Sequence, residues 1–246
     1  MASFNFGVGS LFAVQTGISN PTPAQFGTLQ DIQIDMDFTN KPLMGQYQMA
    51  VAVARGGMKT TGKAKFATID ALVYNEVFFG QTRATGLLEA AANEAGTIPG
   101  SVTYTVTVTH SATFTTDLGV KYAATGVPFI CVATGPTIGQ YSFSAGVYTF
   151  AAADASTAVL ISYAYTASTG GTKIVLNNQL MGAAPQFQMN LMNTYQGKVL
   201  SLQLNACIST KLSLPFKNED WTINEIDFEA FTDASNVLGT ISVTDL

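Results

Sequence analysis

The segment LQDIQIDMDF (residues 29–38) alternates apolar with polar side chains, and INEIDFEAF (residues 223–231) repeats this pattern near the other end of the chain. Successive side chains of a β-strand point to opposite faces, so each segment is predicted to form a strand with one apolar and one acidic face. The carboxylates of the two acidic faces are Asp31, Asp35, Asp37, Glu225, Asp227 and Glu229.

These two acidic faces require a physical explanation. Like charges two residues apart on a strand repel each other, so the faces need water, a bound cation or a role for a negative surface. A solvated outer face is the simplest interpretation of one acidic strand. Here two such strands hold six carboxylates in a chain with only 16 acidic residues. This concentration favours a role for the negative surface.

The composition is poor in charge. Only 11% of the 246 residues are charged, compared with about a quarter in average globular proteins. Such a surface is typical of proteins that contact copies of themselves and of secreted β-proteins. The formal net charge of −5 argues against tight binding of nucleic acid, because affinity for phosphate comes from Lys and Arg. The length allows one large core or two modest ones.

The cysteines and the N-terminus give no sign of secretion or of a membrane anchor. Cys131 and Cys207 lie far apart, match no metal-ligand spacing and are predicted to be free thiols. The N-terminus lacks a basic region and a small-residue cleavage site, so no signal peptide is expected. No run approaches the ~18 apolar residues that span a bilayer. We therefore expect a soluble protein, made in the cytoplasm, with no membrane partner.

Two segments in the first quarter of the chain are expected to make contacts beyond the strands. Residues 1–28 are rich in Gly, Ser, Asn and Pro with scattered Phe side chains, which is typical of an arm that docks on its own domain or on a neighbour. RGGMKTTGKAKF (residues 55–66) is expected to be a flexible hairpin tip or loop, either solvated or against an acidic surface of another subunit. Its basic residues are Arg55, Lys59, Lys63 and Lys65.

The residue pattern changes twice in the centre of the chain, first to a helical spacing and then to short β-type runs. The apolar spacing of ATIDALVYNEVFFGQ (residues 67–81) predicts a helix that Thr68 or Asp70 caps and Gly80 ends. LLEAAANEAG (residues 87–96) is expected to be a short second helix or a linker. Residues 97–175 contain short runs rich in Thr, Tyr, Val and Phe between turn residues, and they predict an inserted β-sandwich-like domain or an excursion of one continuous fold.

The last third returns to alternating strands. Residues 187–192 and 200–209 each alternate apolar with polar side chains, and Gln188 and Asn190 lie on the polar face of the first of them. Every predicted strand outside the middle segment therefore has one apolar and one hydrated face. This pattern predicts a sheet that is covered on one side only, by the helix or by a second sheet.

No catalytic or metal-binding constellation is present in the sequence. His110 is the single histidine and lies in a Thr-rich strand without clustered ligands, so no zinc site is expected. A nucleophile elbow and a phosphate-binding glycine loop are both absent. The acids stand in rows, whereas a glycosidase needs one acid in an apolar pocket, and no calcium-binding loop accompanies them. We expect neither an enzyme nor a cofactor.

Three segments at the two ends of the chain carry a family resemblance. GTLQDIQIDMDF, FATIDALVYNEVFFG and LPFKNEDWTINEIDFEAFTDASNVLGTIS together resemble the tail tube (major tail) protein of a long-tailed bacteriophage. The resemblance covers roughly residues 1–90 and 176–246. The middle segment, especially YSFSAGVYTFAAADASTAVLISYAYTA, resembles β-modules that recur in phage structural proteins and would be an insertion relative to the smallest tube proteins.

The resemblance implies a mainly β protein with a tail-tube-type β-barrel or sandwich, one flanking α-helix and an inserted β-rich domain. Its parts would be an N-terminal arm (residues 1–28), a tube domain (29–96 and 176–246) and the insertion (97–175). Six copies would form a ring, and stacked rings would form the hollow tube of a virion tail through which DNA passes without sticking. Other partners would be tail proteins such as a terminator, a tip and a sheath.

Within such a tube the resemblance suggests two sets of residues. Those expected to face the bore are Asp31, Gln33, Asp35, Asp37, Gln188, Asn190, Glu225, Asp227 and Glu229. Those expected to make contacts between rings are Phe4, Phe6, Phe12, Arg55, Lys59, Lys63 and Lys65.

Two other functions are compatible with the composition. The chain could be a carbohydrate- or surface-binding β-module of a tail tip or fibre, in which tyrosines of the middle segment stack on the ligand. It could also be a capsid decoration protein, although that function gives no reason for two acidic strand faces.

Overall fold

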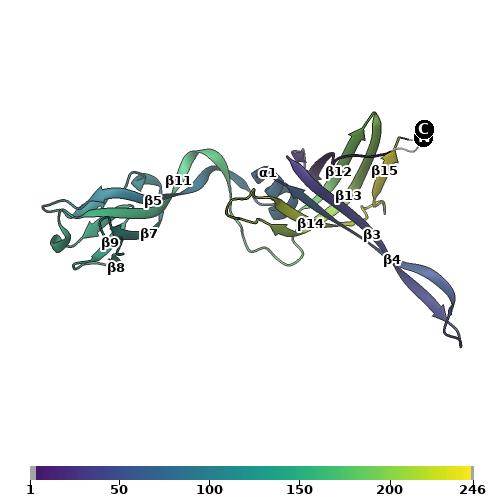
Figure 1. Cartoon of the computed structure of the whole chain (residues 1–246), viewed down its shortest axis with the longest axis horizontal. Coiled ribbons are helices and arrows are strands. Elements are labelled where there is room, and N and C mark those ends of the chain that lie inside the picture. The colour runs from purple at the N-terminus through teal and green to yellow at the C-terminus, as the bar shows by residue number, and fades with distance from the viewer. Residues whose placement is uncertain (1–3, 245–246) are drawn as a thin grey trace. The chain divides into compact units, whose positions relative to one another are not determined.

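The computed structural model describes residues 4–244, and the chain is mainly β, with 56% of its residues in strands and 6% in helical segments. Residues 1–3 of the expected arm and residues 245–246 lie outside the described residues. The chain divides into two compact units (Figure 1): one runs to Thr82 and resumes at Ile174, and the other is Arg83–Lys173. We describe each unit by itself.

One large sheet forms the first unit, with the strand order β2-β1-β12-β13-β14-β4-β3 and with β15 paired to β13. All of these pairs are antiparallel. The strands are β1 (Ser10–Gln15), β2 (Ala24–Gln25), β3 (Leu29–Met44), β4 (Ala50–Phe66), β12 (Gln186–Tyr195), β13 (Lys198–Ser213), β14 (Asn224–Phe231) and β15 (Gly239–Val243). The predicted acidic strands at residues 29–38 and 223–231 are thereby confirmed as β3 and β14.

The helical segment covers the apolar face of this sheet. Val73 of α1 (Ala71–Tyr74) and Val77 of the π-helix η1 (Asn75–Phe79) are buried in the same core as Phe187, Ile226 and Phe228. The sheet is therefore covered by a helix on one side, as one of the two sequence-based alternatives stated.

The predicted helix over residues 67–81 is too long at its start. The Asp70 carboxylate accepts a hydrogen bond of 2.8 Å from the Leu72 amide and caps the helix there. The Ala67 and Thr68 amides instead donate to the carbonyls of Thr28 and Gly27. At the other end Gly80 ends the segment in the left-handed conformation (φ 59°), as predicted.

Residues 1–28 do not form a separate arm throughout. β1 pairs with β12 and β2, and it places Leu11 and Ala13 in the core. The apolar alternation of residues 10–15 is short, but a neighbouring strand satisfies its backbone, which the sequence could not show. Phe4 and Phe6, before β1, are exposed.

The basic segment at residues 55–66 is not a loop, because all of it belongs to β4. β3 and β4 form one long hairpin whose turn is at residues 45–49. Every residue from 35 to 59 is exposed, and the outer part of the hairpin projects beyond the rest of the sheet (Figure 1). We call residues 39–58 the hairpin arm.

The second unit contains two sheets around a second core. One sheet has the order β6-β10-β9-β8 and the other β5-β11-β7, and both contribute aromatic side chains to the core. The strands are β5 (Arg83–Thr97), β6 (Thr105–Thr107), β7 (Phe114–Tyr122), β8 (Ile130–Cys131), β9 (Gln140–Ser144), β10 (Val147–Phe150) and β11 (Ala158–Ile174), with short 3-10 turns η2 (Ser111–Thr113) and η3 (Ala152–Asp154).

The expectation of a helix or linker at residues 87–96 is wrong. These residues lie in β5, which pairs with β11. The alanines and glutamates of this stretch favour a helix in isolation, but pairing with β11 overrides that propensity. The second unit consequently begins at Arg83.

Candidate functional site

The nine residues expected to face a bore lie on one face of the large sheet. Their neighbours along each strand, such as Ile226, Phe228 and Met189, point to the opposite face and are buried in the core. Because side chains alternate along a strand, the polar set shares the face that the helix leaves open. We call this surface, on β3, β4, β12, β13 and β14, the charged face.

β4 lies between the two acidic strands, β3 and β14, and its lysines lie next to their carboxylates. The pairing register aligns Asp31 of β3 and Glu225 of β14 with Lys65 of β4. Two residues further along these strands, Gln33 of β3 and Asp227 of β14 lie on either side of Lys63 of β4 in the same way. The charged face is therefore not the row of unopposed carboxylates that the two acidic strands alone predict.

The lysines form ion pairs with these carboxylates. Lys63 Nζ and Lys211 Nζ each lie 3.2 Å from Glu225 Oε1, and Lys59 Nζ lies 3.5 Å from Glu229 Oε2. Lys65 Nζ lies 3.9 Å from Glu225 and 3.9 Å from Asp31 Oδ2. Lys59, Lys63 and Lys65 were expected to make contacts between rings, and within the single chain they pair with carboxylates of β3 and β14.

The ion pairs shift the titration of their members. Burial alone would raise the pKa of Glu225, but hydrogen bonds from Lys211 and Lys63 outweigh it, so this pKa is lowered. The hydrogen bond to Glu225 in turn raises the pKa of Lys63, with a further contribution from the charge of Asp227. Both groups therefore remain ionised at neutral pH.

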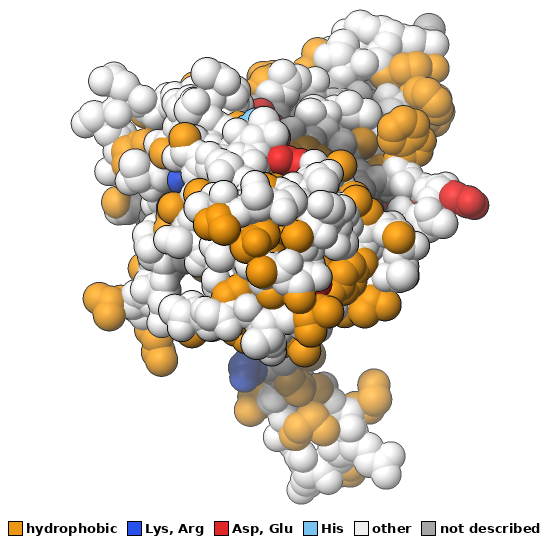
Figure 2. All heavy atoms as spheres, turned by 90° about the vertical axis from the view of Figure 1, so that its left-hand side faces the viewer, with side chains coloured by type: hydrophobic (Ala, Val, Ile, Leu, Met, Phe, Trp, Pro, Cys, Tyr) orange, Lys and Arg blue, Asp and Glu red, His pale blue; other side chains and the backbone are white. Residues whose placement is uncertain are grey.

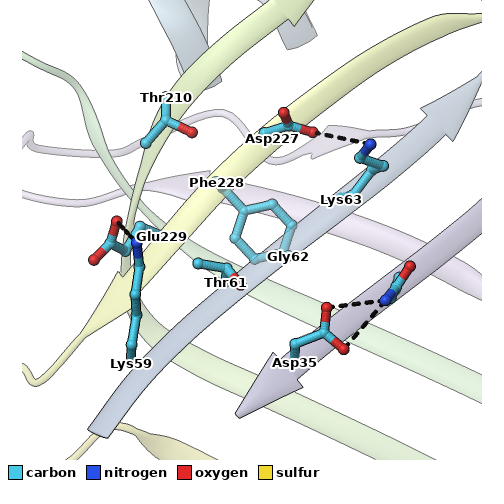
Figure 3. Close-up of a pocket in the computed structure, with 10 residues that line it drawn as sticks. Asp35, Lys59, Thr61, Gly62, Lys63, Thr210, Asp227, Phe228 and Glu229 are labelled. Carbon is cyan, nitrogen blue, oxygen red and sulfur yellow. Dashed lines mark hydrogen bonds and ion pairs between the residues drawn. The ribbon is translucent and has the colours of Figure 1, made fainter. Parts of the chain in front are cut away.

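A polar hollow of about 510 Å³ opens on the charged face (Figure 3). In Figure 3 Asp227 points toward Lys63 and Glu229 toward Lys59, while Asp35 accepts hydrogen bonds from the Gln33 amide at 2.9 and 3.2 Å. Its floor is Gly62 over the Phe228 ring. A Cβ at Gly62 would lie 2.1 Å from Phe228 Cζ, so only glycine allows the ring this position.

The charged face has an excess of carboxylates. It holds the six acids of the two predicted strands against Lys59, Lys63, Lys65 and Lys211, which leaves a formal charge of −2 (−6 from acids, +4 from lysines). Among the described residues no group of three His, Cys, Asp or Glu side chains is placed to hold a metal ion. The face is a hydrated, weakly anionic surface with lysines held by carboxylates.

The sequence contains a signal that places these lysines on a strand. In KTTGKAKF (residues 59–66) Lys59, Lys63 and Lys65 occupy alternate positions with Thr61, while Ala64 and Phe66 are buried. This is the same period of two that identifies the acidic strands. The glycines and basic residues of the longer segment, residues 55–66, are typical of a loop, and this composition conceals the alternation.

The remaining residues expected between rings lie in different places. Phe4 and Phe6 are exposed before β1, whereas Phe12 is half-buried on β1 opposite Asn190. The Arg55 guanidinium lies 4.2 Å from the centre of the Phe38 ring at the base of the hairpin arm, a cation–π contact.

The tyrosines of the second unit are engaged within its own structure. Tyr141 and Tyr148 both donate hydrogen bonds to Asp117, at 2.5 and 2.8 Å, and Tyr163 donates to Glu94 at 2.6 Å. Tyr122 and Tyr165 likewise donate to carboxylates, and His110 stacks on Tyr165. Burial, followed by the hydrogen bond to Glu94, raises the pKa of Tyr163 to about 12. The hydroxyl groups of these five tyrosines are therefore bound to carboxylates of the same unit.

Comparison with protein-family models and with curated proteins gives no match. Within residues 4–244 no helix has the length and apolar character needed to cross a membrane. Figure 2 shows a face of the chain on which hydrophobic side chains are spread widely and charged side chains are few.

Proposed function

We propose that this chain is a structural protein that assembles into stacked hexameric rings, and that these rings form the hollow tail tube of a phage virion. Six copies join their large sheets so that the charged faces line a common bore through which double-stranded DNA passes. The observation that carries the proposal is one continuous sheet with a helix over its apolar face and an open charged face.

The free edge of β3 supports assembly by sheet joining. β3 is 16 residues long, and its one partner in the described sheet is β4. A long unpaired edge offers backbone donors and acceptors to another strand, and proteins ordinarily cover such edges. Joining this edge to the sheet of a neighbouring copy satisfies the backbone and leads to a closed barrel.

The charges of the open face suit a surface past which DNA slides. A phosphate backbone adheres to free Lys and Arg side chains through release of counterions. Here the lysines of the charged face lie within 4.0 Å of a carboxylate, and the net charge is −2. A phosphate must compete with those carboxylates for each lysine, so DNA contacts stay weak.

Electron microscopy of the purified, concentrated protein tests this function. Negatively stained fields should contain hollow rings or filaments, since sheet joining needs nothing besides further copies of the chain. Featureless small particles, together with binding to a glycan array, would instead favour a carbohydrate-binding module.

A further inference from the structure

The hairpin arm carries apolar side chains that its own chain leaves uncovered. Leu43, Met44 and Val53 are exposed by 55 to 63%, and Tyr47 and Met49 at the turn by 78 and 82%. From Pro42 to Ala54 the sequence has no charged residue. Large apolar side chains gathered in the open on one hairpin indicate an interaction site, and Tyr and Met are enriched at protein interfaces.

An apolar groove lies where the sheet changes its pairing. One edge of β13 pairs with β15 from Leu200 to Leu204 and with β14 from Ala206 to Ser213. The turn after β14 is held by Asp233, which accepts hydrogen bonds from Asn205 and from the Val237 amide. Beside the β15 segment a groove of about 230 Å³ opens, and its lining residues are Met36, Leu202, Leu204, Leu238, Gly239, Thr240 and Ile241.

The groove matches the turn of the hairpin arm in size and charge. An apolar cavity of about 150 Å³ holds a benzene molecule, so the groove has room for an aromatic ring such as that of Tyr47. None of its lining residues is charged, and the turn of the arm is also uncharged. Contact between the two therefore removes no charged group from water.

The occupant cannot be the turn of the same chain. Met36 lines the groove, and β3 continues from there as extended strand to Met44. Eight residues at about 3.3 Å each carry the turn about 26 Å away from its own groove. Its return would require the hairpin to break.

We propose that the turn of the hairpin arm, with Tyr47 and Met49, seats in the apolar groove of a second copy of this chain. This inference rests on the proposed assembly and adds the pair of surfaces that hold two copies together. It also gives the exposed apolar residues of the arm a partner that the chain itself supplies.

Cross-linking between two differently tagged copies tests the contact. Cys131, which is exposed, is first changed to serine, and then one copy carries Tyr47→Cys and the other Ile241→Cys. Mild oxidation of the assembled mixture should give a disulfide-linked heterodimer, and neither variant alone should give a dimer. The control pair is Tyr47→Cys with Val102→Cys, since Val102 is 83% exposed on the second unit.

A charge in either surface gives an independent readout. Tyr47→Asp and Ile241→Asp should each raise the concentration needed for assembly by at least about tenfold, or about 1.4 kcal/mol, while Val102→Asp leaves it unchanged. Circular dichroism confirms that each variant is folded. Hollow rings without the heterodimer, or a Tyr47→Cys dimer between two turns, would overturn the inference and leave the tube standing. A chain that stays monomeric at high concentration would overturn both.

Discussion

At the residue scale, the charged face is a set of acids and lysines in register across four strands, β3, β4, β14 and β13. The acids were predicted because they alternate in segments whose other face is plainly apolar. Lys211 was not predicted, because its place opposite Asp227 depends on a register shift between Ser209 and Lys211 in β13. Irregularities of this kind are set by tertiary pairing and leave no signal in the sequence of a single strand.

The acid excess on the charged face predicts weak contact with DNA. Asp35→Lys removes one carboxylate and adds one ammonium group, so the formal charge of this face changes from −2 to zero. The new lysine replaces an acid and is therefore more available to a phosphate. Assembled Asp35→Lys protein should co-sediment with double-stranded DNA at low salt and release it as salt is raised. Asp35→Asn is the control and should not co-sediment. Equal DNA binding by wild type and both variants would contradict the role assigned to the charge.

The Glu225 ion pairs predict a dependence of stability on pH. The pKa of Glu225 in the folded chain lies below its ordinary value of 4.5. Its contribution to stability is therefore fully present above pH 4.5 and is lost as pH falls through the lower, folded-state pKa. Between these two values the free energy of unfolding should fall more steeply for wild type than for Glu225→Gln, measured by urea titration. Parallel curves for the two proteins would contradict the assigned pairing.

At the element scale, alternation identified the strands, and propensity misled where it disagreed with pairing. β3 and β14 were predicted because their alternation is unbroken, whereas residues 55–66 of β4 have the composition of a loop and residues 87–96 of β5 that of a helix. Both are strands because neighbours with free backbone groups lie beside them. The helix and its C-terminal end at Gly80 were predicted from the sequence. Its N-terminal end was not, because it depends on hydrogen bonds from the Ala67 and Thr68 amides to carbonyls elsewhere in the fold.

The short helical segment depends on its N-cap. Asp70→Ala removes the carboxylate that accepts from the Leu72 amide and should lower the free energy of unfolding by about 1 kcal/mol. Asp70→Asn keeps an acceptor oxygen and should lose less. Thermal or urea unfolding measures both variants, and equal losses for Ala and Asn would show that the cap does not stabilise this helix.

At the scale of the whole molecule, the second unit is an insertion whose two ends come together. Gly171 lies against Leu87, and the Asn93 amide donates to Ser162 of the partner strand, so the chain leaves and returns along paired strands. The short Thr-, Tyr-, Val- and Phe-rich runs of the middle segment predicted an insertion from the sequence. Its first strand was not recognised, because that strand pairs with a segment some seventy residues later.

Removal of the second unit tests whether the large sheet is self-sufficient. Residue 82 joined to residue 174 by a short Gly-Ser linker should give a folded protein, because each unit has a hydrophobic core of its own. Its circular dichroism should show a β-protein with cooperative unfolding. An aggregated or unfolded product would mean that the large sheet needs the second unit.

The orientation of the charged face in an assembled particle is the most direct test of the proposed function. Cryo-electron microscopy of rings or filaments formed by the full chain should place Asp35, Lys63 and Glu225 on the wall of a central hole, with the helical segment on the outer side of the sheet. Particles without a hole, or rings whose charged faces point outward, would contradict the account.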